Sequence, residues 1–338
     1  MRRSMSVIIK KVSLGNGKTS SLVILKNDDL TVELLSYGAH IYRVLAKDKV
    51  GKKENIVLNV TPISDIPHDL QYFGATVGPV AGRIKQAKIG QLSLQANESG
   101  NSLHSGSQGW SFQEWELDWQ EDKNSITVIF SYLDDKSGFP GPIKAEVIYT
   151  LVGDQLTITF TGESSVASYF NPTNHSYFNL SGELKKNIEE QNLYVSAPHI
   201  LATDDALIPT GAFIAVSGTP YDFTNAKRVN QALRDLPDGL DTAYIFAEDS
   251  DSNTVLVSDD VSGRTLTVTS NARSVIIYTA TGWHRTTYVN HRPMVKNLGL
   301  AIEFQEIPDT PNHPEWGDVA LLPGKKIVKS INYKFGVK

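Results

Sequence analysis

The chain of 338 residues contains no cysteine. This absence excludes disulfide bonds, cysteine-ligated zinc, iron–sulfur clusters and catalytic thiols. There is no long basic run, and a formal net charge of -5 lacks the positive footprint of a nucleic-acid-binding protein. No apolar stretch approaches the roughly 18 residues that a membrane-spanning helix requires. The sequence therefore predicts neither a nucleic-acid partner nor a membrane partner.

Composition and length favour one large globular unit. Hydrophobic residues make up 40% of the chain and charged residues 20%, which is enough for a sizeable core. All-β domains often reach about 200–250 residues undivided, and no Pro-, Ser- or Gly-rich linker interrupts residues 1–338. The apolar part of residues 1–11 is too short for a signal peptide and predicts a first strand. We expect a single soluble domain in the cytoplasm.

Apolar and polar residues alternate with a period of two along most of the chain. In one segment Leu156, Ile158 and Phe160 alternate with three threonines. The same alternation recurs in four further segments, at residues 126–132, 145–151, 265–269 and 331–335. These segments read as strands with one polar face. The pattern predicts an all-β fold of large antiparallel sheets.

Only one segment is typical of a helix. Thr224 is a candidate N-cap, the apolar residues of 226–236 share a face, and Pro237 and Gly239 would end the helix. A single helix among so many strands excludes a layered α/β fold. We therefore expect few, short helices.

Two histidines lie in segments rich in amide, hydroxyl and aromatic side chains. His104 lies within residues 101–106, and His175 lies within residues 170–180. Such groups suit a pocket that hydrogen-bonds a polyol and stacks on its ring, although either histidine could instead be structural. The eight histidines form no closely paired metal-binding motif, so we expect no metal.

A third segment places a carboxyl group in an apolar strand. Glu303 lies between Ile302 and Phe304, and alternation sends Gln305 to the same face as Glu303. On an exposed face this would be an ordinary solvated strand. On a pocket face, desolvation would raise the pKa of the carboxyl group toward the range useful for a general base. The residues alone leave both interpretations open.

The order of several motifs resembles that of the aldose 1-epimerases (galactose mutarotases), over nearly the whole chain. The segments that carry the resemblance are Gly78–Ile84, Leu103–Gly106, Asn171–Leu180, Gly239–Asp241, Ile302–Gln305 and Pro308–Asn312. The run around His175 is specific, whereas the short run around His104 would be weak alone. The resemblance implies a single large β-sandwich with an open cleft. It also implies cofactor-free interconversion of the α and β anomers of a hexose. The sequence leaves the oligomeric state open between a monomer and a homodimer.

The resemblance assigns an acid and a base. Glu303 matches the family's base, which removes the proton of the C1 hydroxyl, and His175 matches the general acid to the ring oxygen. Both residue types can titrate near neutral pH when burial and neighbours tune them. The reaction then requires a protonated His175 and an ionised Glu303, which support one another at short range.

The resemblance also assigns substrate-binding positions to Arg83, His104 and Asp241, whose donors and acceptors can select hydroxyl orientation. The structural alternatives are a surface salt bridge, a turn histidine and a loop aspartate. Tyr278 matches an aromatic residue that borders the sugar, although in a strand it could equally belong to the core.

Three positions depart from the family pattern, namely Gly82, Ser105 and Thr242, and we expect them to affect substrate binding. They leave the preferred sugar open among galactose, glucose, another aldose or a disaccharide such as maltose. Two other functions compete with epimerisation. One is a non-catalytic carbohydrate-binding protein, and the other is a glycoside hydrolase that uses Asp241 and Glu303 as its two carboxylates.

Overall fold

The computed structural model describes residues 5–248, 253–283 and 287–338, and its named strands pair antiparallel in three large sheets and several two-stranded ones. The five-stranded sheet contains, in spatial order, β1 (Ser6–Ser13), β2 (Thr19–Lys26), β3 (Leu30–Leu35), β4 (His40–Lys47) and β5 (Lys53–Asn55). The six-stranded sheet contains, in spatial order, β17 (Tyr177–Phe178), β28 (Leu300–Gln305), β25 (Ser274–Tyr278), β22 (Asp241–Ile245), β19 (His199–Thr203) and β20 (Pro209–Ala215).

The nine-stranded sheet contains, in spatial order, β11 (Glu116–Glu121), β12 (Ile126–Asp134), β13 (Ile143–Val152), β14 (Gln155–Ser164), β30 (Ile327–Val337), β24 (Arg264–Ser270), β23 (Asn253–Ser258), β18 (Asn192–Val195) and β21 (Lys227–Arg228). The two-stranded pairs are formed by β6 (Thr76–Val77) with β16 (Thr173–Asn174), β7 (Arg83–Ile84) with β10 (Ser102–Leu103), β8 (Lys88–Ile89) with β9 (Leu92–Ser93), β15 (Ser168–Tyr169) with β29 (Ala320–Leu321), and β26 (Tyr288–Val289) with β27 (Arg292–Pro293). The helical segments are α1 (Val229–Leu233) and the 3-10 turns η1 (Gly15–Gly17), η2 (Ile63–His68), η3 (Lys85–Ala87), η4 (Trp110–Phe112), η5 (Thr310–Asn312) and η6 (Pro314–Trp316).

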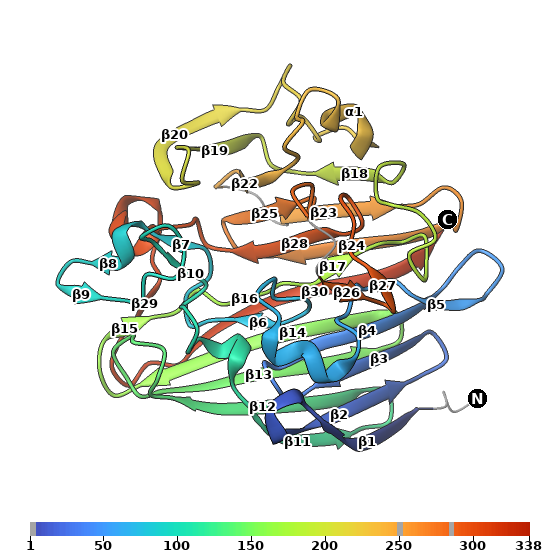
Figure 1. The fold of residues 1–338 in the computed structure, drawn as a ribbon, viewed down its shortest axis with the longest axis horizontal. Helices are drawn as coiled ribbons and strands as arrows, with labels where there is room; N and C mark the ends of the chain where they lie inside the picture. Colours follow the sequence, from blue (N-terminus) through green and yellow to red (C-terminus); the bar gives the residue numbers. More distant parts are fainter. Residues whose placement is uncertain (1–4, 249–252, 284–286) are drawn as a thin grey trace.

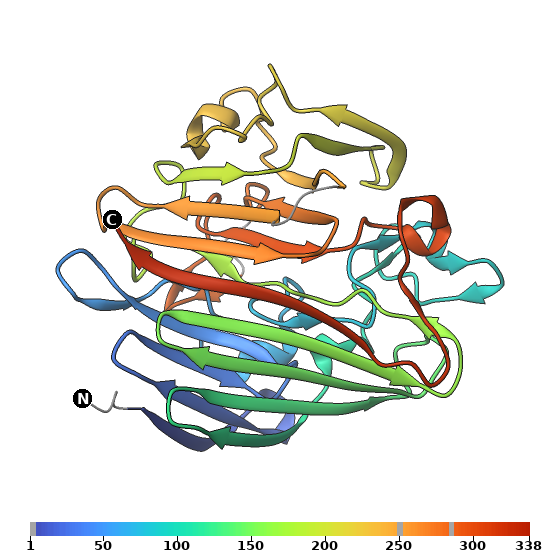
Figure 2. The same ribbon diagram turned by 180° about the vertical axis from the view of Figure 1, so that it is seen from behind.

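The sheets form a sandwich. In Figure 1 the five-stranded sheet lies in front, below the six-stranded sheet. Figure 2, the view from behind, shows the nine-stranded sheet as a continuous layer on the other side. One hydrophobic core joins the layers, with Val32 from β3, Val147 from β13 and Ile302 from β28 among its buried members. The expected all-β sandwich of antiparallel sheets is confirmed.

Alternation along the central strands produces this core. Strand β13 buries every second residue from Ile143 to Leu151 and leaves the intervening side chains at least partly exposed. Strand β14 does the same with Leu156, Ile158 and Phe160. Because successive side chains point to opposite faces of a strand, one face of the sheet packs on the core and the other faces solvent.

The expected helix is shorter than its sequence suggests. Helix α1 begins at Val229 with Arg228 at the N-cap, so the prediction of Thr224 as N-cap is wrong. The amide and hydroxyl groups of Thr224 instead donate to Asp222 Oδ1, at 3.0 and 2.6 Å. The chain enters the nine-stranded sheet as β21 before it turns into the helix, and this pairing with β18 overrides the helical pattern.

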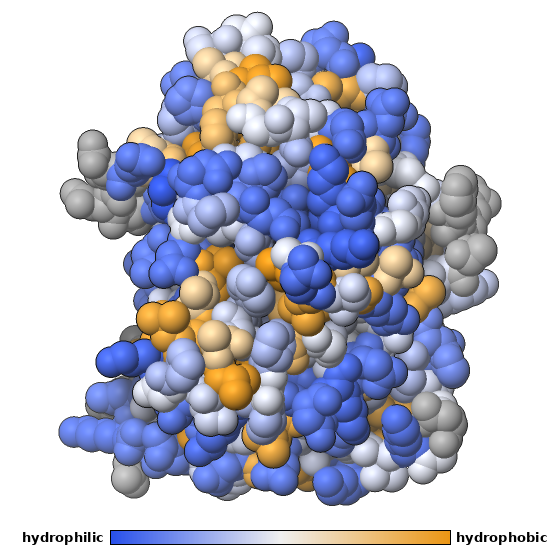
Figure 3. Space-filling model, turned by 90° about the vertical axis from the view of Figure 1, so that its left-hand side faces the viewer, coloured by the Kyte–Doolittle hydropathy of each residue, from blue (hydrophilic) through white to orange (hydrophobic). Residues whose placement is uncertain are grey.

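Strand β20 forms an outer edge of the six-stranded sheet. Its Phe213 and Ile214 are 43% and 45% exposed. The face of the molecule in Figure 3 is mostly hydrophilic, with apolar patches near its top and across its middle. Among the helices of the described residues, none combines the length and the apolar character needed to cross a membrane.

Candidate active site

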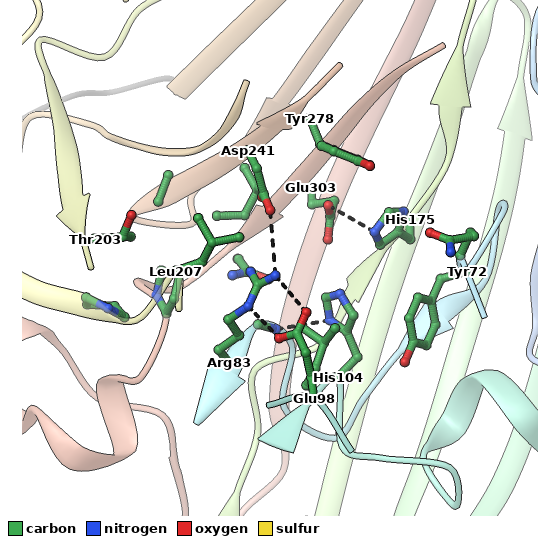
Figure 4. Close-up of a pocket in the computed structure, with 18 of the residues that line it drawn as sticks. Tyr72, Arg83, Glu98, His104, His175, Thr203, Leu207, Asp241, Tyr278 and Glu303 are labelled. Carbon is green, nitrogen blue, oxygen red and sulfur yellow. Dashed lines mark hydrogen bonds and ion pairs between the residues drawn. The ribbon is translucent and has the colours of Figure 1, made fainter. Parts of the chain in front are cut away.

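Six residues named from the sequence line one open cavity, whose volume is about 910 Å³ when the open solvent at its mouth is included. They are Arg83, His104, His175, Asp241, Tyr278 and Glu303 (Figure 4). Sequence segments that are remote from one another therefore supply a single pocket.

The six-stranded sheet forms one wall of the cavity. Glu303 on β28 pairs with Ile276 on β25, and both side chains line the cavity. The neighbouring Ile302 and Phe304 point the other way and belong to the hydrophobic core. Of the two interpretations left open for Glu303, the structure thus favours the pocket face, because alternation along β28 separates a core side from a cavity side.

Asp241 and Tyr278 lie on the same wall, since they are paired residues of β22 and β25. The hydroxyl of Tyr278 accepts a hydrogen bond from Trp283 Nε1 at 3.0 Å, which fixes the direction of the phenol. Burial raises the pKa of Tyr278 above its usual value, so the ring faces the cavity as a neutral phenol. Trp283 itself is not among the cavity-lining residues.

His175 reaches the cavity from the short segment between β16 and β17. Its amide donates to Ala75 O and its carbonyl accepts from Gly74 N, both at 2.9 Å, so the backbone is fixed on both sides. The ring of Tyr72 stacks on the imidazole with centroids 5.8 Å apart. These contacts leave His175 with little freedom to move away from Glu303.

Glu303 and His175, a carboxyl group and an imidazole, face one another in the cavity as an acid–base pair. Glu303 Oε1 lies 3.2 Å from His175 Nε2, and their side chains are 3% and 7% exposed (Figure 4). Burial raises the pKa of Glu303 well above its usual value, with a smaller contribution from Asp241 and an opposing one from Arg83. Burial lowers the pKa of His175 to about 4.

Both shifts disfavour the charged forms, so burial favours the uncharged arrangement of the pair, with a carboxylic acid on Glu303 and a neutral imidazole on His175. The ionised arrangement that the reaction requires differs only by one proton transfer across 3.2 Å. Among the described residues, Glu303 Oε2 has no hydrogen-bond partner, and this oxygen is free to accept from a ligand.

Arg83 on β7 is held between two carboxylates. Its Nε and Nη2 donate to Glu98 at 2.6 and 3.0 Å, and Nη2 lies 3.6 Å from Asp241 Oδ2. Burial acts to lower the pKa of Arg83, but these acidic neighbours raise it above its usual value. Burial raises the pKa of Asp241, although Arg83 opposes the change. The pKa values of Arg83 and Asp241 therefore depend on their charged neighbours in this cluster.

His104 and Gly82 bind one another through two hydrogen bonds. His104 N donates to Gly82 O at 3.0 Å, and Gly82 N donates to His104 Nδ1 at 3.1 Å. Since Nδ1 accepts, the neutral ring must carry its proton on Nε2. Burial lowers the pKa of His104 well below its usual value, so this ring presents one N–H donor to the cavity.

One group of side chains could be considered for a metal ion. His104, His175 and Glu303 offer ligand atoms that all lie within 4.8 Å of one another. A histidine that binds metal through Nε2 normally donates a hydrogen bond from Nδ1, whereas Nδ1 of His104 faces the N–H of Gly82. This donor set therefore does not fit a metal ion and suits hydrogen bonding to a ligand.

The three departures from the family pattern have different positions. Gly82 lines the cavity with φ at +78°, and a Cβ there would lie 3.1 Å from Gln305 Nε2. The hydroxyl of Ser105 is buried away from the cavity, where it bonds to the backbone of Val80. Thr242 is also outside the cavity lining. The expectation that all three affect binding therefore applies directly only to Gly82.

The sequence did not single out three further side chains of the cavity as site residues. Glu98 clamps Arg83, and Tyr72 packs on both cavity histidines. Gln305 presents an amide whose oxygen and nitrogen are both buried and have no partner among the described residues. Of these three, only Gln305 could be identified from the sequence, because alternation places it on the same strand face as Glu303.

Known proteins resemble the chain over nearly its full length. The model of the aldose 1-epimerase family matches residues 21–334. Galactose mutarotase of Mus musculus is 32% identical over 328 residues, with 95% of each chain covered. Maltose epimerase of Levilactobacillus brevis is 28% identical over 337 residues, with 96% of each chain covered. The crystal structure of galactose 1-epimerase from Lactobacillus acidophilus superposes with a TM-score of 0.87 at 28% identity, covering 99% of each chain.

Proposed function

The chain belongs to the aldose 1-epimerase family, and from this premise we propose that the acid–base pair exchanges the anomers of a hexose such as galactose or glucose. The protein is an isomerase with aldose 1-epimerase activity. The observation that supports the assignment of residues is the 3.2 Å approach of His175 Nε2 to Glu303 Oε1 inside one open cavity. The alternatives of a non-catalytic binding protein and a glycoside hydrolase are not favoured by these relatives.

In the proposed reaction, Glu303 removes the proton from the anomeric hydroxyl while His175 gives a proton to the ring oxygen. The bond between C1 and the ring oxygen breaks, and C1 becomes an aldehyde. Rotation about the C1–C2 bond presents the other face of the aldehyde. The same two transfers in reverse then close the ring as the opposite anomer, so the enzyme ends in its starting state without a cofactor.

The protonation states of the pair before and after ring opening explain why burial of the pair assists the reaction. The closed sugar requires the ionised pair, whereas the open-chain complex leaves a carboxylic acid on Glu303 and a neutral imidazole on His175. The second arrangement is the one that burial favours, through the raised pKa of Glu303 and the lowered pKa of His175. Ring opening thus removes two buried charges, and the buried site stabilises the intermediate relative to the bound hemiacetal.

The remaining polar side chains are proposed to orient the sugar. His104 donates through Nε2, Asp241 accepts, and Arg83 retains Nη1, which has no acceptor among the described residues. Hydroxyl groups of a hexose both donate and accept, so this mixed set can select their orientation. Tyr278 supplies an aromatic border.

A disaccharide is a second candidate substrate. The cavity continues along Leu201, Thr203, Leu207 and Pro209. In Figure 4, Thr203 and Leu207 lie on the other side of Asp241 from Glu303. That stretch could hold a second sugar ring, as a substrate such as maltose would require, while its reducing end reaches the acid–base pair.

Polarimetry on freshly dissolved α-galactose and α-glucose tests the proposal, with maltose as a third substrate. We expect the optical rotation to relax faster with the protein than in buffer alone. Relaxation at the buffer rate for a range of aldoses would contradict it. We further propose that residues 1–338 act as a single domain in the cytoplasm, as a monomer or homodimer.

A further inference from the structure

Glu98 contributes a carboxylate to the cavity that the exchange reaction does not use. Its Oε2 accepts a hydrogen bond from Arg83 Nε at 2.6 Å, and its Oε1 accepts from Arg83 Nη2 at 3.0 Å. This side-on, two-point contact between a carboxylate and a guanidinium adds both energy and geometric specificity. Asp241 approaches the same Nη2, so the guanidinium lies between two carboxylates (Figure 4).

The backbone holds Glu98 firmly in this place. Glu98 and Asn101 flank a two-residue turn whose central residues, Ser99 and Gly100, have φ of 47° and 84°. Positive φ at both positions is typical of a type I′ hairpin turn. Backbone hydrogen bonds join the flanking residues in both directions, at 3.2 and 2.8 Å. The side chain of Asn97 fastens the loop to β10 with two more. The carboxylate is thus positioned before any sugar arrives.

The charges that line the cavity do not balance. Arg83 is the only arginine or lysine among the described residues of the lining. The two cavity histidines add no positive charge, because burial lowers the pKa of both. The acid–base pair has no net charge whichever member holds the proton. Glu98 and Asp241 together outnumber Arg83 by one negative charge, and without Glu98 the lining would be neutral.

We propose that Glu98 is a specificity-determining residue that restricts this enzyme to uncharged sugars. Without Glu98, Arg83 would face only Asp241, at 3.6 Å, and its Nε and Nη2 would attract phosphate or carboxylate groups. Glu98 occupies the two N–H groups on one side of Arg83 and repels an incoming anion, while Nη1 remains for a neutral hydroxyl. Specificity of this kind depends on a repulsive element as much as on an attractive one. The inference rests on the proposed anomer exchange.

The test is Glu98→Gln, which removes the charge but keeps an oxygen that can accept from Arg83. The substrates are the better of glucose and galactose, its 6-phosphate and its uronate. NMR saturation transfer between the anomeric protons measures exchange for all of them at equilibrium. We expect the ratio of kcat/KM for the neutral sugar to that for each anion to fall at least tenfold. The change should be smaller at 1 M salt, where screening acts over about 3 Å.

Two further variants serve as controls. Glu98→Asp keeps the charge and should keep a ratio close to that of the unmodified protein. Glu116→Gln makes the same change of net charge on the exposed side of β11, outside the cavity, and should also leave the ratio unchanged. A fall of less than tenfold in Glu98→Gln, or an equal fall in Glu116→Gln, would overturn the proposal. Failure of the unmodified protein to exchange any neutral aldose would instead contradict the proposed function itself.

Discussion

His175 Nε2 lies 3.2 Å from Glu303 Oε1, in a part of the cavity where both side chains are almost completely buried. Strand β28 supplies the carboxyl group, and the segment between β16 and β17 supplies the imidazole. At this distance a proton given up by one group can be taken by the other, so the titration of each group depends on the state of its neighbour. Two predictions depend directly on this relationship.

The first prediction concerns the loss of either member of the pair. We expect Glu303→Gln and His175→Asn each to lower kcat for anomer exchange by at least about a hundredfold, the scale of one positioned acid or base. The double variant should be little slower than the slower single variant, because an acid and a base that act in one step are not additive. Polarimetry with the blank rate subtracted measures all three.

Matched controls for these variants are available elsewhere in the chain. Glu116→Gln and His199→Asn make the same chemical changes at exposed positions outside the cavity, and both should keep the rate of the unmodified protein. Turnover near that rate in Glu303→Gln or in His175→Asn would refute the role proposed for that residue.

The second prediction is the pH dependence of kcat/KM. As pH falls toward 4, His175 gains a proton while Glu303, whose pKa is raised, is already protonated, so no base remains. As pH rises above the raised pKa of Glu303, the pair loses its only proton and no acid remains. We expect a plateau with its acid limb near pH 4 and its alkaline limb well above the usual carboxyl range. An acid limb near 6.5, the value for a free imidazole, would contradict the burial argument.

Much of the fold could be predicted because the central strands follow period-two alternation without interruption. The segments 145–151 and 331–335 alternate clearly, and both are strands of the nine-stranded sheet. The helix was misplaced because its local pattern competes with a tertiary contact, the pairing of β21 with β18. The local sequence does not indicate pairing with a strand that is distant along the chain.

The cavity was predictable where its residues lie in recognisable motifs or on a regular strand face. Alternation alone placed Glu303 and Gln305 on one side of β28, although it could not tell a pocket from solvent. Glu98 and Tyr72 lie in turns with left-handed backbone at Ser99 and at Tyr72 itself, where no periodicity indicates the direction of a side chain. Their contacts with Arg83 and His175 emerge only in three dimensions.

The final prediction concerns Tyr72, whose ring stacks on His175. Its ring centroid lies 5.8 Å from that of His175 and 4.7 Å from that of His104. Its backbone has a φ of 58°, in a turn where Asp69 accepts hydrogen bonds from the backbone on either side of Tyr72. We expect Tyr72→Ala to admit water beside the imidazole and to weaken the desolvation that lowers the pKa of His175.

The acid limb of kcat/KM in Tyr72→Ala should therefore move from about pH 4 toward 6.5, with kcat reduced about tenfold as the pair loses its fixed geometry. Removing a buried aromatic ring should also cost about 3 kcal/mol of unfolding free energy, measured by thermal or denaturant unfolding. Tyr72→Phe keeps the ring and should leave both the limb and the rate unchanged. If Tyr72→Ala lost stability but kept its acid limb near pH 4, Tyr72 would be a packing residue with no influence on the proton held by His175.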